Sequence, residues 1–317
     1  MTRDCRGINI FWGMYYTSLP DHSKPEFDEE SHFSQFKRHN IVFNALASKS
    51  YRVRHVGCLS VKTILSGEEW YEVNNRPLAV RPGQFLILND SQDYYCQVDT
   101  AGEVRIQSVF FQAAFASSIF RDALTREDSL LDNPFEAGRQ SLEFFQTLYD
   151  TDAGLAQKMG SLMASLNEYG YDSTRVDEHL VFLLHHLIRT HKKETERAHR
   201  VSAIKPATRK EIYKRLCIAK DFLHSTFMDK QDLSGISNTA CLSSPQLVRQ
   251  FKAVFRTTPH QYLTRIRLTH AAGLLKHTST PVHEITWRCG FENTSAFCRA
   301  FKTEYGVPPL HFRMKKG

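Results

Sequence analysis

Residues 282–305 read VHEITWRCGFENTSAFCRAFKTEY, a pattern that predicts two short helices joined by a tight turn. We expect the first helix to end near Gly290, because glycine adopts the left-handed backbone that a sharp turn needs. Asn293 or Thr294 is suited to cap the second helix, which continues through Lys302. Helix, glycine turn and second helix together predict a helix-turn-helix.

The same pattern occurs about fifty residues earlier, where residues 233–255 read LSGISNTACLSSPQLVRQFKAVF. In this copy Ser244 is suited to the N-cap and Pro245 to the first position of the second helix. Matched positions are offset by 49 up to the turn and by 50 after it, so one single-residue slip relates the copies. The matched pairs are Ile236/Ile285, Cys241/Gly290, Leu242/Phe291, Arg249/Arg299, Phe251/Phe301, Lys252/Lys302, Phe255/Tyr305 and Pro259/Pro309.

A long helix from about His260 to His277 is predicted between the two copies. At ~1.5 Å per residue it spans roughly 25–27 Å. Successive major-groove windows on one face of DNA lie ~34 Å apart. We therefore expect the two second helices to enter successive windows, so that one chain reads two segments of one half-site.

The second helix of each copy is expected to bury apolar side chains, Leu247 and Phe251 in the first copy and Phe297 and Phe301 in the second. The opposite face suits a DNA major groove, because Arg bonds bidentately to guanine, small polar groups reach base edges or phosphates, and Lys neutralises phosphate. The residues predicted on these outer faces are Gln246, Val248, Arg249, Lys252, Thr294, Ser295, Cys298, Arg299 and Lys302.

Positive charge is concentrated in the last third of the chain. Residues 205–317 hold 19 Lys+Arg and 7 Asp+Glu, a balance of +12. The preceding 204 residues hold the other 22 basic and 27 acidic residues, a balance of −5, within a total of +7. This asymmetry points to a C-terminal module that meets a polyanion such as double-stranded DNA.

Residues 214–314 resemble the C-terminal domain of AraC/XylS-type transcription regulators. The resemblance implies that Ser244, Pro245 and Ala296 also face bases or phosphates, together with positions 248, 249, 294, 295, 298 and 299. It further implies promoter DNA and RNA polymerase as partners. An activator is the role we name, although the sequence itself leaves activation and repression both open. The matching motifs are Arg267-Leu268-x-x-Ala271-x-x-Leu274-Leu275, Glu284-Ile285, Cys289-Gly290-Phe291, Phe297-x-Arg299-x-Phe301-Lys302 and Gly306-Val307-x-Pro309.

The first copy departs from the family pattern at its turn. Cys241 stands where the family usually has Gly, and Ser237 where it usually has a small Ala. If the left-handed geometry is kept, a residue other than glycine costs roughly 1–2 kcal/mol there. The second copy therefore keeps the better family pattern, and which copy reads bases more selectively stays open.

The N-terminal part predicts a different fold. Residues 40–112 show short strands with turn signals, typical of a β-sandwich or barrel, and residues 116–192 have helical periodicity. The strands resemble the cupin-like sensor domain common in this family. We predict a two-domain α+β chain, in which an all-α C-terminal domain follows a cupin-like barrel with flanking helices. The predicted divisions are a sensor and dimerisation domain (1–192), a charged linker with Pro206 (193–209) and a double helix-turn-helix domain (210–317).

A small-molecule effector is expected inside the barrel. The candidate ligand-binding residues are Arg52, as an anion anchor for which Arg54 is the alternative, and the aromatic side chains Trp70, Tyr71, Tyr94 and Tyr95. Packing in the core or at the rim is the competing interpretation for each. Enzymatic cupins bind a metal through a His-x-His and a downstream Glu, whereas residues 68–72 read EEWYE. We predict no metal, no cofactor and no catalytic site, although a cupin enzyme fused to a DNA-binding domain stays an alternative, as does an effector-independent DNA-binding protein.

An apolar stripe in the predicted helix at 174–192 is either a dimer contact or a face packed against the barrel. Family resemblance favours a homodimer. No run approaches the ~20 apolar residues of a membrane span, and no signal peptide is evident, so we expect a cytoplasmic protein that binds no membrane. The stripe comprises Val176, Leu180, Leu183, Leu184 and Leu187.

Overall fold

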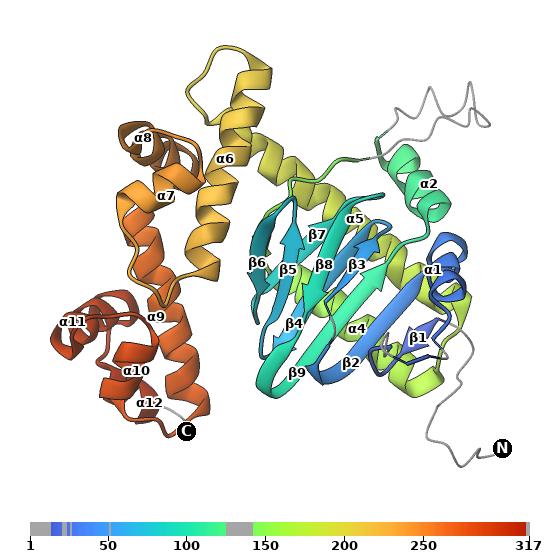
Figure 1. Cartoon of the computed structure of the whole chain (residues 1–317), viewed down its shortest axis with the longest axis horizontal. Helices are drawn as coiled ribbons and strands as arrows, with labels where there is room; N and C mark the ends of the chain where they lie inside the picture. The colour runs from blue at the N-terminus through green and yellow to red at the C-terminus, as the bar shows by residue number, and fades with distance from the viewer. Residues whose placement is uncertain (1–13, 21–23, 26, 51, 125–141, 315–317) are drawn as a thin grey trace. The chain divides into compact units, whose positions relative to one another are not determined.

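The computed structural model describes residues 14–20, 24–25, 27–50, 52–124 and 142–314. Contacts divide the chain into an N-terminal unit, residues 1–194, and a C-terminal unit, residues 195–317 (Figure 1). The N-terminal unit combines sheets with helices, and the C-terminal unit is helical wherever it has regular structure in the described part. The predicted two-part α+β organisation is thus confirmed. None of the described helices is long and apolar enough to cross a membrane.

The N-terminal unit contains two sheets, and every strand pair in them is antiparallel except β1 with β2. The first follows the order β1 (Tyr15–Tyr16), β2 (Ile41–Lys49), β9 (Asp99–Phe110), β4 (Ser60–Ser66), β7 (Gln84–Leu88) and β10 (Leu148–Asp150). The second follows the order β3 (Val53–Val56), β8 (Asp93–Gln97), β5 (Glu69–Val73) and β6 (Arg76–Val80). These strands confirm the strand-rich reading of residues 40–112.

Strand β5 shows how the second sheet separates its two faces. Glu69, Tyr71 and Val73 are buried, whereas Trp70 and Glu72 are only partly buried. Successive side chains of a strand point to opposite faces, so every second residue enters the interior. The interior they enter is an apolar cluster shared by both sheets, which also includes Ile64, Leu78, Leu86, Tyr94 and Ile106.

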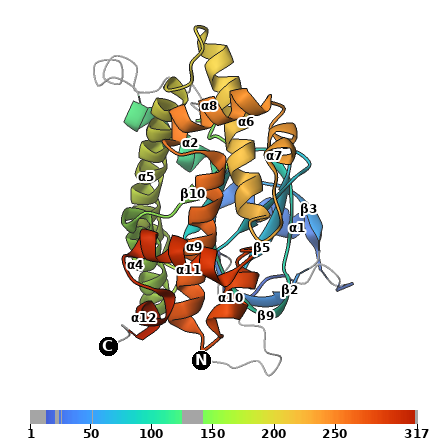
Figure 2. The same cartoon turned by 90° about the vertical axis from the view of Figure 1, so that its left-hand side faces the viewer.

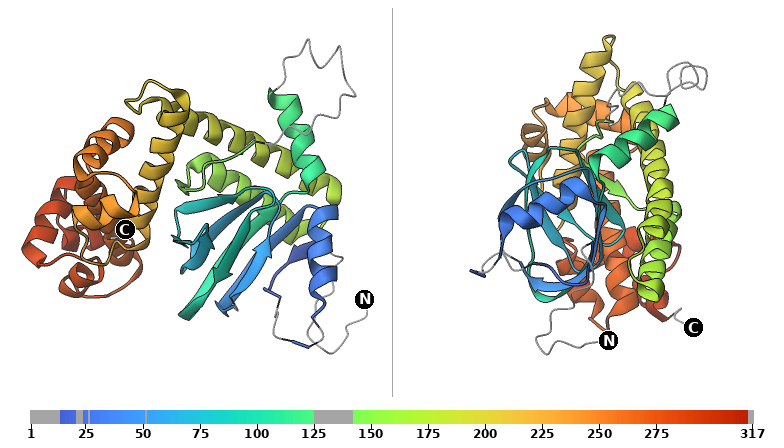
Figure 3. Two further views of the ribbon diagram at one scale, coloured as in Figure 1. Left: turned by 45° about the horizontal axis from the view of Figure 1, so that its top comes forward. Right: turned by 90° about the vertical axis from the view of Figure 1, so that its right-hand side faces the viewer.

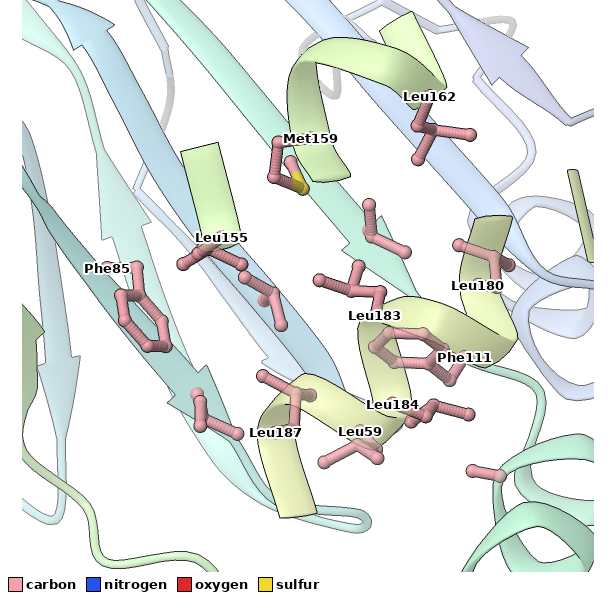
Figure 4. Close-up of a cluster of buried hydrophobic side chains, with 14 of the residues drawn as sticks. Leu59, Phe85, Phe111, Leu155, Met159, Leu162, Leu180, Leu183, Leu184 and Leu187 are labelled. Carbon is pink, nitrogen blue, oxygen red and sulfur yellow. The ribbon is translucent and has the colours of Figure 1, made fainter. Parts of the chain in front are cut away.

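Among the described residues, four helices accompany these sheets: α1 (Glu29–Arg38), α2 (Ala113–Leu124), α4 (Ala153–Tyr169) and α5 (Ser173–His199). Helices α4 and α5 run along one side of the sheets, seen at the right of the right-hand view in Figure 3. Their apolar stripes meet side chains of the six-stranded sheet and of the chain beside it, among them Leu59, Phe85 and Phe111 (Figure 4). The stripe at Leu155, Met159 and Leu162 is almost fully buried there.

The predicted dimer stripe belongs to this same core. Leu180, Leu184 and Leu187 have no exposed surface, and Val176 and Leu183 are at most 2% exposed. Because the sheet and α4 already cover these side chains, they offer nothing to a second copy of the chain. The structure therefore corrects the assignment of this stripe to a dimer contact and supports the alternative, packing against the sheet.

The predicted linker, residues 193–209, is largely helical. Residues 193–199 continue α5, and Pro206 begins α6 (Pro206–Ser225). Proline is tolerated at this first position because the N–H that it lacks would have no partner within the helix. The residues between the two helices belong to the C-terminal unit and pack within it. The Ser202 amide donates to the Gln250 side chain at 3.0 Å, and Val201 is buried. The charged composition of residues 193–209 therefore reflects the solvent-exposed end of a helix, and the segment is not a flexible linker throughout.

The rest of the C-terminal unit consists of α7 (Leu233–Thr239), α8 (Ser244–Phe255), α9 (Pro259–His277), α10 (Val282–Arg288), α11 (Thr294–Tyr305) and α12 (Pro309–Met314). Helix α9 confirms the predicted long connection, and its 19 residues span roughly 28 Å. A capping box at Thr258 and Gln261 begins it, with Pro259 in its first turn. Helices α7 and α8 precede α9, and α10 and α11 follow it (Figure 2).

Candidate DNA-binding site

The turns of the two predicted helix-turn-helix units have the same hydrogen bonds. In the first, Cys241 donates its amide to Asn238 O at 3.0 Å and Leu242 donates to Ser237 O at 3.0 Å. In the second, Gly290 donates to Trp287 O at 2.9 Å and Phe291 donates to Thr286 O at 3.1 Å. These partners are the residues that the 49-residue offset pairs, so the sequence repeat is also a repeat of backbone geometry.

Gly290 is required by a close approach as well as by its left-handed backbone (φ 73°). A Cβ atom at this position would lie 2.7 Å from Met228 O and 2.9 Å from Phe227 O. The same loop is bound by Arg267 of α9, which donates to Phe227 O at 2.7 Å and to Asp229 O at 2.8 Å. The second turn is therefore packed directly against the loop that follows α6.

The helices after each turn bury the faces that the sequence predicts. Leu247 and Phe251 of α8, and Phe297 and Phe301 of α11, have no exposed surface. In α11 these rings contact buried residues of α9 and α10, including Leu268 and Ile285. Burial of these side chains fixes which face of each helix remains outside.

The N-caps resolve two details of the prediction. Asn293 caps α11, since its side chain accepts a hydrogen bond from the Ala296 amide at 2.7 Å. In α8 the N-cap position is Ser243, one residue earlier than predicted, and Pro245 is the second helical residue. The Ser244 hydroxyl lies 2.9 Å from the Ser237 hydroxyl and is partly buried, so this interaction competes with any contact it makes to DNA.

The outer faces of α8 and α11 carry cations that have no partner. No carboxylate in the described part of the chain forms an ion pair with Arg249, Lys252, Arg299 or Lys302, all of which are exposed. Elsewhere in this unit several exposed cations do have partners: Arg215 with Glu211, Lys230 with Glu292, Arg265 with Glu304 and Arg288 with Glu284. The unpaired cations leave positive charge free on the outer faces of the two helices.

The other predicted contact residues also reach these surfaces, though not equally. Those that are exposed are Pro245 and Ser295. Those that are partly exposed are Ser244, Gln246, Val248, Thr294, Ala296 and Cys298. In Figure 1, α8 lies near the upper, N-terminal end of α9, and α11 lies beside the lower part of α9. The two helices that carry these basic faces both contact α9, at different places along it.

A family model described as a helix-turn-helix domain matches residues 236–315, which hold both turns and both outer faces. The transcriptional activator RhaS of Escherichia coli O1:K1 / APEC is 33% identical over 99 residues, 31% of this chain. Residues 236–315 are an AraC/XylS-type helix-turn-helix domain. The match spans only 36% of the length of RhaS, so the relatives inform the AraC/XylS-type domain and not the N-terminal unit.

Solved structures of similar proteins include the C-terminal domain of AraT, a response regulator from Geobacillus stearothermophilus. It is 29% identical and covers 32% of this chain and 85% of that domain, with a TM-score of 0.31. ToxT from Vibrio cholerae is 14% identical and covers 88% of this chain and 99% of its own, with a TM-score of 0.33. Both TM-scores are low, so the description of the AraC/XylS-type domain rests on this chain's own contacts.

The N-terminal unit has a cavity that is lined by only some of the predicted ligand-binding residues. Tyr71 and Tyr94 line it. Trp70 and Tyr95 do not, because each neighbours an inward residue and so points to the opposite face of its strand. Arg52 also lies outside, bonded to Glu72 with its guanidinium 4.8 Å from the Tyr95 ring centroid. The structure thus corrects the assignment of Arg52, Trp70 and Tyr95 to the cavity.

Sequence reasoning missed several residues of this cavity. Lys62, Glu69, His55 and Cys96 line it, with aromatic residues of α1. A signal was available for Lys62, because it is the one charged residue of β4, a largely buried strand, and charged side chains are rarely buried without a partner. In the described part of the chain, no group of three or more His, Cys, Asp or Glu side chains is placed to hold a metal ion.

Proposed function

We propose that this chain is a sequence-specific DNA-binding transcription regulator that grips promoter DNA with α8 and α11 and responds to a small-molecule effector in the N-terminal unit. The observation that carries the proposal is the repeated turn geometry, with an unpaired Arg and Lys on the outer face after each turn. The resemblance to RhaS, an activator by name, supports activation of transcription, with RNA polymerase as a partner.

In this proposal the cations have distinct tasks, which their positions along the helices support. Arg249 and Arg299 lie in the first half of their helices, the part that meets base edges in a helix-turn-helix. A bidentate Arg–guanine pair is worth about 1–3 kcal/mol of discrimination against a wrong base. Lys252 and Lys302 follow three residues later, and their charge neutralises phosphates. Small side chains such as Ser295 leave room for α11 to approach the groove closely.

The N-terminal unit supplies the response in this proposal. Strands of its two sheets line a cavity, as expected of a cupin-like sensor. A homodimer remains part of the proposal, through a surface other than the buried stripe of α5. A regulator that meets promoter DNA and RNA polymerase acts in the cytoplasm.

Selection of bound fragments from genomic DNA of the source organism, using the full chain, tests the proposal. A recovered fragment should bind with an affinity that falls steeply as salt rises, because cations displace condensed counterions from the phosphates. Fragments no tighter than random DNA would contradict sequence-specific binding. A binding affinity that no small molecule changes would favour the effector-independent alternative.

Arg299→Ala provides the sharper test on the recovered fragment. We expect a loss of about 1–3 kcal/mol in binding free energy, with relaxed selectivity at one base position. Arg105→Ala is the matched control, since it removes the same charge from an exposed site in the N-terminal unit. Fluorescence anisotropy on cognate and random duplexes measures both. An equal loss on both duplexes would make Arg299 a phosphate contact.

A further inference from the structure

The cavity of the N-terminal unit is lined by strands of both sheets and by α1. Its volume is about 90 Å³, several times the ~10–15 Å³ that one water molecule needs. Four phenylalanines line it with an apolar wall: Phe33, Phe36, Phe43 and Phe110. The Phe36 and Phe110 ring centroids lie 4.7 Å apart, and those of Phe43 and Phe110 lie 5.6 Å apart. Such a space suits a body about the size of one ring.

One charged side chain reaches this apolar wall. Lys62 of β4 is only 3% exposed, and its Nζ lies 3.3 Å from the Phe110 ring centroid and 5.5 Å from that of Tyr94. Burial lowers the pKa of the Lys62 ammonium to about 8, so most of it carries its proton at neutral pH. The side chain is therefore a buried cation that faces the cavity.

The Lys62 ammonium lacks an acceptor. Among the residues that the structure describes, none accepts a hydrogen bond from it and no carboxylate lies within ion-pair distance. An ammonium has three donors, and a buried charge without such partners is costly. The aromatic rings offset part of that cost through cation–π attraction, but they provide no lone pair. An oxygen anion from outside the chain would meet this need.

Glu69 of β5 is the carboxylate whose charge acts on Lys62, and it already has a hydrogen-bond partner. Tyr71 donates its hydroxyl to Glu69 Oε2 at 2.6 Å. Burial raises the pKa of Glu69 to about 7, with the charge of Lys62 opposing that rise. An arriving anion favours the protonated form of Glu69, so this carboxyl group can give up its charge when the cavity fills. The unsatisfied group in the cavity is then the cation.

We propose that this cavity binds a small organic monoanion with an apolar body about one ring in size, its carboxylate on Lys62 and its body between Phe36, Phe43 and Phe110. The assignment deepens the proposed effector control, on which it rests, by naming the chemical class of the effector. A cationic ligand of the same size is disfavoured because it would lie beside the Lys62 ammonium.

Isothermal titration of the full chain with benzoate, benzamide and benzylamine tests the class, because the three share one ring and differ in charge. We expect benzoate to bind at least tenfold more tightly than benzamide, and benzylamine to bind most weakly. Benzamide or benzylamine binding as tightly as benzoate would overturn the proposal. So would the absence of binding by all three at millimolar concentration.

Two variants assign the binding to the predicted group. Lys62→Met keeps an unbranched, flexible side chain but removes the ammonium, and it should weaken benzoate at least tenfold while leaving benzamide nearly unchanged. Lys192→Met, an exposed site on α5, is the matched control. Glu69→Gln should tighten benzoate, since it removes a competing charge, and it keeps the test valid if Lys62→Met does not fold. Unchanged benzoate affinity in both cavity variants would overturn the proposal.

The pH dependence provides a second readout. The titratable side chains that share the cavity with Lys62 come from four elements: His32 of α1, His55 of β3, Glu69 and Tyr71 of β5, and Tyr94 and Cys96 of β8. Cys58 also acts on the charge of Lys62, and His55 lies 3.6 Å from Cys96 Sγ. Benzoate stays ionised at pH 6 to 9, whereas Lys62 loses its proton near pH 8 and Glu69 near pH 7. Benzoate affinity should therefore fall at least tenfold between pH 6 and pH 9. A flat profile would contradict the role of Lys62.

The affinity of the full chain for its genomic fragment, measured with and without benzoate, separates this inference from the proposed function. A changed DNA affinity supports both. Benzoate that binds through Lys62 without changing DNA affinity supports the ligand class and overturns effector control. DNA affinity is thus measured independently of the titrations with benzoate, and the control Lys192→Met should leave it unchanged.

Discussion

The two helix-turn-helix units reach the same backbone with different residues. The second has glycine at both left-handed positions, Gly290 in the turn (φ 73°) and Gly306 after α11 (φ 76°). The first has Cys241 (φ 50°) and Arg256 (φ 62°) at the matching places. A residue other than glycine costs roughly 1–2 kcal/mol in this conformation. The comparison shows that packing of the helices on both sides, rather than the local residue, imposes the turn.

The surroundings of the two turns explain why only one needs glycine. The carbonyls of Phe227 and Met228 leave no room for a side chain at Gly290. Cys241 is exposed, and its carbonyl accepts a hydrogen bond from Arg215 of α6 at 2.9 Å. The first turn therefore tolerates a side chain at the cost of backbone strain, whereas the second is sterically closed.

The largest effect is expected when both units lose their arginine. Arg249→Ala and Arg299→Ala should each cost about 1–3 kcal/mol on the cognate fragment. Because α8 and α11 contact different parts of a helix roughly 28 Å long, the costs should add to about 2–6 kcal/mol in the double variant. Anisotropy titrations of the three variants measure this. A double variant no weaker than one single variant would mean that only one unit touches DNA.

Gly290→Ala should destabilise the C-terminal unit by about 2–4 kcal/mol, since a left-handed alanine and a backbone clash add together. Urea unfolding of the full chain, followed by the helical signal, measures the loss. Gly306→Ala is the matched control: it has a similar φ, but nothing lies within 4 Å of the added Cβ. Only the backbone cost of about 1 kcal/mol should remain there. Equal losses in both would refute the steric account of Gly290.

The smallest expected effect is a gain. Cys241→Gly should stabilise the C-terminal unit by about 0.5–1 kcal/mol, because relief of the left-handed strain exceeds the added chain entropy of glycine. Cys241→Ala removes the thiol but keeps the strain, and should bring no gain. A shift of the urea midpoint measures both. Stabilisation by alanine equal to that by glycine would show that the thiol, not the backbone, is unfavourable.

Most of the DNA-binding site could be predicted because its signals are local. The Phe297/Phe301 spacing marks the buried face of α11, Asn293 marks its start, and the 49-residue repeat transfers the geometry to the first unit. The predicted N-cap of α8 was wrong by one residue, because Ser243 and Ser244 are adjacent and both suit an N-cap. Such errors arise where neighbouring residues satisfy the same local rule.

The N-terminal unit was less predictable because its signals depend on distant segments. The periodicity of α5 correctly marks Leu180 and Leu187 as one face, but it does not say whether a second chain or the sheet covers that face. The strand pattern does not say whether Trp70 or Tyr71 enters the interior, because both are aromatic and a shift of one residue exchanges the two faces.

By itself, the sequence determined the helix-turn-helix repeat, the long helix between its copies and the basic outer faces, since turns, caps and helical faces depend on residues close together in the chain. Only the tertiary structure decided that the α5 stripe is covered by the sheet, that Gly290 lies against a carbonyl of Met228, and that Lys62 meets Phe110 in a cavity. Those contacts join residues more than forty positions apart, and burial of a side chain depends on what the rest of the fold brings to it.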